Sequence, residues 1–335
     1  MDRMNRLPPY KKLLFSAIVL FVIVALPEAA CRLSGRGQST ETPAYFADWR
    51  MAPDGEPYWV LQGQGHNSEG MRDREHAVQK PQGVHRIVCL GDSVTIGHGL
   101  RREEIFPVLL ESFLQQIGLE AEVLNIATPG WSTRQELIAY RRIGRKYRPD
   151  HVFLGFCLND VAEMQNNLQS PPPAWQSWMI RNSAFMRWLI DAEGRQVNDA
   201  RQLFQQPMPN AVAKGWQLVF EDLLRLRDAV KADNAEFSVI VFPFRFQLSE
   251  SAPEPVPQQV LIGFCRKHGI PCFDMREVLA PLGEEALIDQ SHLSVEGAKV
   301  VATALINWGK TGCMMCGLDL ATVDADTCPR CGRPR

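Results

Sequence analysis

The chain has 335 residues, of which 45% are hydrophobic and 22% are charged, and its formal net charge at pH 7 is −2. This length and apolar content are sufficient for a large packed core. The nearly balanced charge lacks the basic excess that phosphate backbones attract, so no nucleic-acid partner is expected. Five of the nine cysteines are scattered along the chain, which does not indicate a disulfide framework.

The first element is an apolar run, Leu13–Leu26, that basic residues precede and a proline ends. This run is shorter than the roughly 20 residues of a bilayer span and resembles the core of a signal peptide. However, Glu28 occupies a position where a cleavage site needs a small residue, and Ala29–Leu33 can extend the span. We therefore predict an uncleaved anchor over residues 1–31, with a cleaved signal peptide, lipidation at Cys31 or a soluble helix as alternatives. The basic residues predict a cytoplasmic N-terminus and a body on the non-cytoplasmic side of the membrane.

Residues 32–84 form a polar extension that lacks a long periodic run. Pro57–Leu61 and the turn-rich His66–Gly70 predict a short strand and a hairpin ahead of the main domain.

From His85 onward, strand and helix patterns alternate. The helix patterns are an apolar stripe between Ile105 and Ile117, a helix that a capping box at Ser132 opens, a long helix before the fourth strand, and a last helix capped by Ser294. Nearly continuous apolar runs are typical of parallel strands covered on both faces. They predict a three-layer α/β/α fold with a parallel sheet of about five strands, at residues 87–90, 123–127, 151–157, 237–242 and 271–275.

This main domain spans residues 85–309, and residues 161–213 interrupt its alternation. They contain three consecutive prolines at 171–173 and a cluster of tryptophan, phenylalanine and methionine. We interpret the interruption as a helical insertion that packs on the domain. The alternative is a lid or a membrane-facing wall beside a substrate cleft.

The chemistry starts at Ser93, which follows Gly91 and Asp92 at the end of the first strand. A serine there sits at a helix start outside the carboxyl end of a strand, where backbone N–H groups stabilise developing negative charge. Gly-Asp-Ser alone is a weak motif, because a serine hydroxyl needs a base and an orienting carboxylate. His292 and Asp289 supply both in one loop before the last helix.

Two further groups could complete an oxyanion hole with the N–H of Ser93. They are the N–H of Gly130, in the turn after the second strand, and the side-chain amide of Asn159, after the third. Because these loops leave consecutive strands, we expect one cleft to collect them.

The order Ser93, Gly130, Asn159, His292 resembles that of the SGNH, or GDSL-type, hydrolases, from about Arg86 to Trp308. The resemblance implies a flavodoxin-like fold. It also implies that serine is the nucleophile, histidine the base and aspartate its orienter, with glycine and asparagine completing the oxyanion hole. One departure is Cys157, which replaces the glycine that the family usually has two residues before the asparagine. The pattern Asn67-Ser68-x-Gly70-x-Arg72-Asp73 also resembles membrane-tethered bacterial members.

Other interpretations of these residues are structural. Ser93 could only cap a helix, Asp289 and His292 could be a surface capping pair, and Asn159 could belong to a turn. His98 is an alternative base, although its place in a glycine-rich turn favours a cleft-lining or buried role. Cys89 and Cys157 lie in apolar strands, which favours inert core thiols.

The tail, residues 310–335, carries two Cys-x-x-Cys-Gly motifs and resembles a zinc ribbon. Four thiolates at this spacing suit tetrahedral zinc, and so short a segment has no core of its own. Two disulfides or a redox pair are the alternatives, and the tail is a possible protein-docking module. The predicted structural zinc ligands are Cys313, Cys316, Cys328 and Cys331.

The sequence therefore predicts a membrane-tethered serine esterase that needs no cofactor for catalysis. Its substrate would be an acyl or acetyl ester of a small molecule, lipid, sugar or cell-envelope polymer. One alternative is acyl transfer to a polysaccharide hydroxyl by the same residues. A second is a non-catalytic binding domain in an envelope complex.

Overall fold

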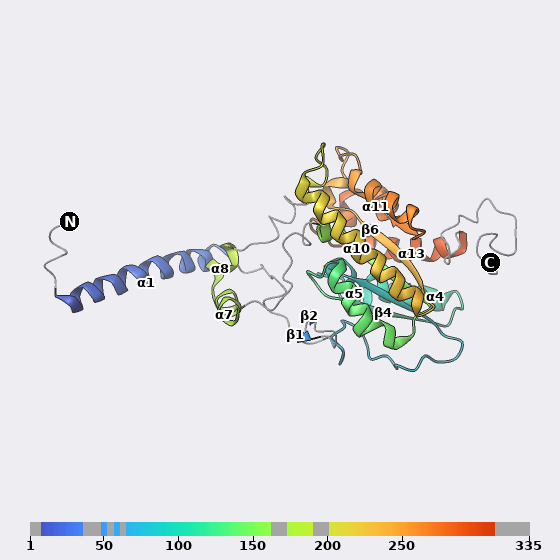
Figure 1. Cartoon of the computed structure of the whole chain (residues 1–335), viewed down its shortest axis with the longest axis horizontal. Coiled ribbons are helices and arrows are strands. Elements are labelled where there is room, and N and C mark those ends of the chain that lie inside the picture. Colours follow the sequence, from blue (N-terminus) through green and yellow to red (C-terminus); the bar gives the residue numbers. More distant parts are fainter. Residues whose placement is uncertain are drawn as a thin grey trace. The chain divides into compact units, whose positions relative to one another are not determined.

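The computed structural model describes residues 8–35, 48–51, 57–60, 65–161, 173–189 and 201–311. The chain divides into two compact units (Figure 1). The smaller unit combines Met1–Phe46 with Pro171–Arg195, and the larger unit combines Ala47–Ser170 with Gln196–Arg335.

The larger unit is built on a five-stranded sheet in the order β4-β3-β5-β6-β7, and every pair in it is parallel. The strands β3 and β5 at its centre are buried along almost their whole length, as the apolar runs predicted. The α/β fold with a parallel five-stranded sheet is thus confirmed. The strands are β3 (His85–Gly91), β4 (Ala121–Ala127), β5 (His151–Cys157), β6 (Glu236–Phe242) and β7 (Cys272–Asp274).

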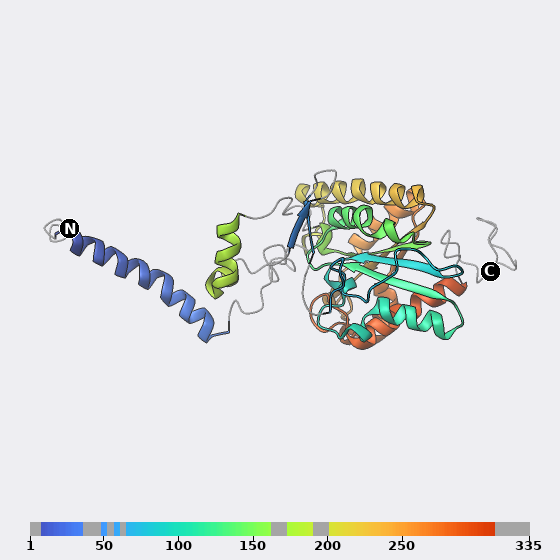
Figure 2. The ribbon, with the colours of Figure 1, turned by 90° about the horizontal axis from the view of Figure 1, so that it is seen from below.

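Helices cover both faces of this sheet. Figure 2 shows α5 and α10 on one side of the strands and α4 and α13 on the other. The side chains that α10 turns inward recur every three or four residues, from Val212 to Val230, which is the period of a helix buried on one face. The long helices are α4 (Phe106–Gln116), α5 (Thr133–Arg142), α10 (Asn210–Ala232), α11 (Val256–Lys267) and α13 (Val295–Thr311).

Short helical segments complete the larger unit. They are α3 (Ser93–Ile96), η2 (Arg102–Glu104), η3 (Gly144–Tyr147), η4 (Arg245–Gln247), α12 (Met275–Leu279) and η5 (Ala280–Ala286). The helix predicted to begin at Ser132 is therefore α5, which is followed by the separate 3₁₀ turn η3. Ser294 caps the last helix, as predicted, because its Oγ accepts a hydrogen bond from the N–H of Gly297 at 3.1 Å.

The order of the strands determines where a site can form. The chain passes from β3 to β4 on one side and then crosses to β5 on the other side of β3. At such a switch point the two connections leave the sheet in opposite directions, and a crevice opens at the carboxyl ends of the strands. Ser93 follows β3 and Asn159 follows β5, so both lie at this end of the switch point.

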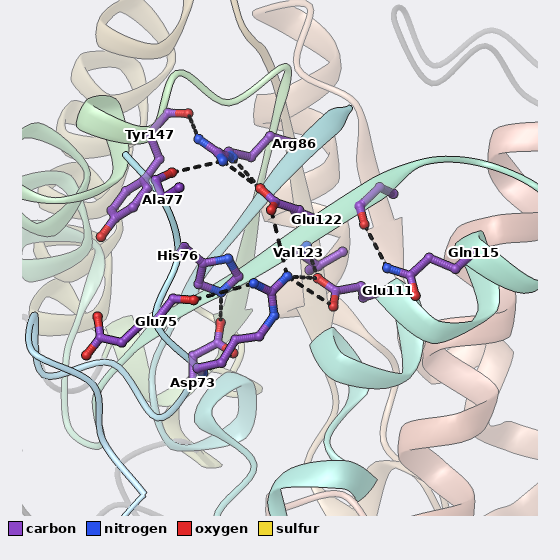
Figure 3. Close-up of polar contacts among 12 residues, drawn as sticks. Asp73, Glu75, His76, Ala77, Arg86, Glu111, Gln115, Glu122, Val123 and Tyr147 are labelled. Carbon is purple, nitrogen blue, oxygen red and sulfur yellow. Dashed lines mark hydrogen bonds and ion pairs between the residues drawn. The ribbon is translucent and has the colours of Figure 1, made fainter. Parts of the chain in front are cut away.

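The outer strand of the sheet, β4, is protected by carboxylates. Asp73 accepts a hydrogen bond from the N–H of Asn125 at 3.0 Å, and Glu111 accepts one from the N–H of Val123 at 2.7 Å. These N–H groups would otherwise be open to pairing with a strand of another molecule. His76 donates to or accepts from Asp73 at 2.9 Å (Figure 3), so the extension that precedes β3 closes the edge of the sheet.

Arg86 attaches the same extension to the core. Its guanidinium is fully buried and contacts Glu122 at 2.6 Å and the carbonyl oxygens of Ala77 at 3.0 Å and Tyr147 at 2.7 Å (Figure 3). A buried charge is tolerated only when it is paired and hydrogen-bonded, as this one is.

A second, two-stranded sheet lies in the larger unit. It pairs β1 (Asp48–Met51) with β2 (Pro57–Val60) in antiparallel register. The strand predicted at Pro57–Leu61 is present as β2, and its partner β1 precedes it in the chain. The turn predicted at residues 66–70 is a separate feature. That turn is closed locally, by hydrogen bonds from the N–H of Gly70 to the carbonyl of Asn67 and from the N–H of Asn67 to the carbonyl of Met71.

The smaller unit contains α1 (Pro9–Leu33), α7 (Ala174–Asn182) and α8 (Ala184–Leu189). Helix α1 continues through Pro27 and has 25 residues, so it extends beyond the apolar run Leu13–Leu26 at both ends. By length and composition it could cross a membrane. A cleavable signal sequence would meet the same criteria.

Candidate active site

Ser93 is the first residue of α3, directly after the turn that ends β3. Asp92 precedes it as the N-cap, and its Oδ1 accepts a hydrogen bond from the N–H of Val94 at 2.9 Å. A Cβ at Gly91 would overlap the side chain of Thr95, so only glycine fits this turn. The tight turn places the partly exposed Ser93 at the carboxyl end of the inner strand β3.

Asn159 reaches the same turn from the neighbouring strand. Its Nδ2 donates to Oδ2 of Asp92 at 3.4 Å, and the strands are in register with Gly91 opposite Gly155. Cys157 ends β5 with its side chain buried. The replacement of glycine by Cys157 therefore leaves Asn159 in contact with the residue next to Ser93.

The loop after β4 brings Gly130 to this edge of the sheet. The N–H of Thr128 donates to the carbonyl of Gly91 at 3.2 Å, which joins the end of β4 to the end of β3. Gly130 has a φ of +76°, a conformation that favours glycine. Among the residues that the structure describes, no group accepts a hydrogen bond from the N–H of Ser93 or of Gly130. Both N–H groups can therefore donate to a ligand.

Asp289 and His292 form a hydrogen-bonded pair in the loop before α13. Nδ1 of His292 lies 2.6 Å from Oδ2 of Asp289, and Oδ1 accepts from the N–H groups of Ser291 and His292, each at 2.9 Å. Burial acts to raise the pKa of Asp289, but these hydrogen bonds, above all that from the imidazole, hold the pKa well below its usual range. Asp289 is therefore an ionised acceptor at neutral pH.

The other ring nitrogen of His292, Nε2, is buried, and no described residue is a hydrogen-bond partner for it. An imidazole whose Nδ1 is held by a carboxylate keeps its proton there and presents Nε2 as the basic atom. The pair thus has the tautomer that a general base requires.

Contacts from the turn after Ser93 show that the loop of His292 lies beside it. The ring centroids of His98 and His292 are 4.6 Å apart, and the N–H of His98 donates to the carbonyl of Ser93 at 3.0 Å. A Cβ at Gly99 would overlap Ile288, the residue before Asp289. His98 is exposed, and its ring lies against that of His292.

Arg72 is a residue of this site to which the sequence analysis gave no role. Its guanidinium donates to the carbonyl oxygens of Ile96 at 3.1 Å, Gly97 at 2.6 Å and Leu100. The first two carbonyls end the helix that Ser93 begins, and the third belongs to the turn after it. Arg72 therefore fixes this turn from the extension. The Asn-Ser-x-Gly-x-Arg-Asp pattern was the available indication, but its spacing alone does not reveal which carbonyls the arginine contacts.

A second histidine–serine pair has a different location and role. His151 Nε2 and Ser238 Oγ are 3.0 Å apart, and His151 is the first residue of β5, at the opposite end of that strand from Asn159. Both side chains are fully buried. Burial, with a smaller effect of His85, lowers the pKa of His151 to about 3, so this pair is a neutral hydrogen bond inside the sheet.

The four tail cysteines lie outside the described residues, so their predicted zinc site stays a prediction. Within the part of the chain that the structure describes, no group of three or more histidine, cysteine, aspartate or glutamate side chains could hold a metal ion.

The family model that matches the chain is that of the GDSL-like lipase/acylhydrolases, over residues 89–300. Similar solved structures include LAE5, an α/β hydrolase enzyme from the metagenome of Lake Arreo, Spain, with 14% identity and a TM-score of 0.45 over 69% of this chain and 96% of LAE5. A catalytic mutant of Axe2, an acetylxylan esterase from Geobacillus stearothermophilus, has 16% identity and a TM-score of 0.43 over 67% and 93% of the two chains. The esterase EstA from Pseudoalteromonas sp. has 13% identity and a TM-score of 0.44 over 68% and 97%. No curated protein sequence matches the chain.

Proposed function

The chain belongs to the GDSL-like lipase/acylhydrolase family and is an ester-bond hydrolase, and from this premise we propose that it is a serine esterase with Ser93 as its nucleophile. The observation that carries the proposal is the Asp289–His292 pair, which lies beside the turn of Ser93. Nε2 of His292 has no hydrogen-bond partner among the described residues, so it can accept a proton.

In the first half of the reaction, Oγ of Ser93 attacks the carbonyl carbon of the ester while Nε2 of His292 takes the hydroxyl proton. Asp289 stabilises the imidazolium that forms and keeps the ring in place. The negative oxygen of the tetrahedral intermediate is stabilised by the N–H groups of Ser93 and Gly130 and the amide of Asn159. His292 then gives its proton to the departing alcohol, which leaves an acyl-enzyme at Ser93.

In the second half, water attacks the acyl-enzyme and His292 removes its proton. Collapse of the second tetrahedral intermediate releases the carboxylic acid and returns the proton to Oγ of Ser93. The reaction uses no group beyond this chain and water. The proposed substrates are acyl or acetyl esters of lipids, sugars or cell-envelope polymers.

The test is labelling with a fluorophosphonate probe followed by an ester panel. Ser93→Ala is expected to abolish labelling and to lower kcat/KM for short p-nitrophenyl esters by roughly 10⁴-fold, because the nucleophile is lost while the fold is kept. Ser251→Ala, at an exposed serine outside the site, serves as the matched control and should behave as the parent protein does. Unchanged turnover in a folded Ser93→Ala protein would contradict the proposal.

We also infer that α1 is retained as a single membrane anchor that places the hydrolase on the non-cytoplasmic side. Its support is the 25-residue helix, whose apolar window has no residue buried inside the protein, and the basic residues that precede it. An anchored chain should float with phospholipid vesicles and resist alkaline extraction. Release of the full chain by alkali would contradict anchoring without affecting the assignment of Ser93.

A further inference from the structure

The smaller unit joins two distant parts of the sequence. Helix α8 lies against the carboxyl-terminal end of α1 (Figure 1). Both α7 and α8 belong to the insertion that follows β5. More than a hundred residues separate them from α1 in the sequence. The contact is therefore a tertiary one that neither helix's own pattern requires.

One carboxylate makes most of this contact. Glu28, in the last two turns of α1, accepts hydrogen bonds from Oγ of Ser183 at 2.7 Å and from the N–H groups of Ala184 at 3.0 Å and Phe185 at 2.9 Å. Arg32 pairs with Glu28 at 2.6 Å and donates to the carbonyl of Asn182 at 3.0 Å. Hydrogen bonds to an ionised group are about twice as strong as neutral ones, so these two residues clamp the α7–α8 connection to the end of α1.

The clamped helices expose large apolar side chains. Trp175 and Trp178 of α7 are 62% and 66% exposed, and Trp188 and Leu189 at the end of α8 are 40% and 56% exposed. Trp175 and Trp178 are three residues apart and so share a face of α7. Exposed tryptophans in a cluster are uncommon on a surface that contacts only water.

The position of this cluster indicates what covers it. Helix α1 exposes apolar side chains along its length, and its first ionised groups after that stretch are Glu28 and Arg32. A membrane helix changes from apolar to charged where it leaves the hydrocarbon, and tryptophan is enriched at that boundary. With α1 in a membrane, contacts between Glu28, Arg32 and the α7–α8 connection would bring α7 and α8 to that boundary.

We propose that α7 and α8 are a membrane-surface element, in which Trp175, Trp178 and Trp188 insert at the lipid–water boundary beside α1. This proposal rests on the retention of α1 as a membrane anchor, which forms part of the proposed function. It assigns Glu28 a structural role at the position where a signal peptide would carry a small residue.

The test uses the full chain in phosphatidylcholine vesicles whose acyl chains are brominated or unbrominated, because bromine quenches only tryptophans at membrane depth. We expect brominated lipid to quench the parent protein, and the triple variant Trp175→Phe, Trp178→Phe, Trp188→Phe to lose most of that quenching. Trp216→Phe, at a buried tryptophan of the larger unit, is the matched control and should keep it.

Hydrogen exchange in the same vesicles tests the clamp. Glu28→Ala should accelerate exchange of the amides of Ala184 and Phe185 and reduce the quenching, whereas Glu285→Ala, at an exposed carboxylate, should change neither. Unchanged quenching in the triple variant would overturn the proposal. So would the loss of a dimer in the triple variant, because the tryptophans would then contact a second copy of this chain and not lipid.

These experiments distinguish failure of the anchor, failure of the surface element and failure of the assignment of Ser93. Protein that does not float with vesicles would refute the anchor and the surface element together. Protein that floats without tryptophan quenching would refute only the surface element. Ester hydrolysis measured in parallel reports on Ser93 and is independent of both.

Discussion

Two carboxyl groups lie near the proposed base, and their surroundings move their pKa values in opposite directions. Complete burial raises the pKa of Asp92, although the N–H of Val94, the charge of His292 and the amide of Asn159 oppose the shift. At Asp289 the hydrogen bonds outweigh burial and lower the pKa. Opposite shifts at neighbouring acids separate their roles. Asp289 is ionised and orients the imidazole, while Asp92 caps α3 and positions Ser93.

The buried His151 gives the fold a predictable sensitivity to acid. Its pKa is near 6.5 in the unfolded chain and about 3 in the folded protein, so between these values the unfolded chain binds the extra proton. The free energy of unfolding should then fall as pH drops through this window, by up to about 1.4 kcal/mol per pH unit. His151→Gln keeps a polar group toward Ser238 but does not titrate. In this variant, the decrease in the free energy of unfolding between pH 6 and pH 5 should be smaller by about 1 kcal/mol.

Urea unfolding of the full chain in mild detergent, followed by circular dichroism at each pH, measures this difference. His268→Gln, at a partly exposed histidine that caps the carboxyl end of α11, is the matched control and should retain the parent slope. An equally steep slope in His151→Gln would show that other groups cause the acid sensitivity.

At the scale of elements, the extension before β3 holds the turn that carries Ser93, the proposed nucleophile. Arg72 places donors on three carbonyls at the end of α3, and no single lysine ammonium reproduces that fork. Arg72→Met keeps the aliphatic stem but frees the turn. It should lower kcat by about 10- to 100-fold with a smaller change in KM, because small displacements of reacting atoms are costly.

Steady-state hydrolysis of p-nitrophenyl acetate and the rate of fluorophosphonate labelling measure the effect of Arg72. Arg74→Met removes a nearby, more exposed arginine that contacts Glu111 at 3.3 Å, and it should leave kcat unchanged. Partial recovery in Arg72→Lys would support positioning, and a parental kcat in Arg72→Met would refute it.

The elements that the sequence predicted well are those whose cause is local. Continuous apolar runs predicted all five parallel strands, and the residues expected at the site follow strands or precede the last helix as anticipated. The contacts that the sequence did not reveal are long-range ones between polar groups. The side chains of Asp73, Arg72 and Glu28 bind backbone atoms of β4, of the turn at the end of α3 and of α8, respectively. Every residue carries the same backbone carbonyl group and nearly every one the same N–H group, so the sequence does not indicate which of them is the partner.

At the scale of the whole molecule, the predictions for the two ends of the chain favour different redox environments. The proposed anchor, with basic residues before α1, would place the body outside the cytoplasm, where thiols tend to oxidise. The predicted zinc ribbon would need its four tail cysteines to stay reduced. Bound zinc would satisfy both conditions, because a coordinated thiolate is protected from oxidation.

We therefore expect the full chain, purified without reductant, to carry about one zinc ion, held by the tail. Elemental analysis and alkylation of the intact protein test this expectation. Blocked tail thiols that open on chelation indicate zinc, and thiols that open only on reduction indicate disulfides. Thiols that react at once, with no zinc present, would contradict the ribbon. Since Ser93, His292 and Asp289 need no metal for the proposed reaction, chelation should leave hydrolysis of short esters unchanged. A loss of turnover in parallel with the zinc would instead show that the tail supports the catalytic domain.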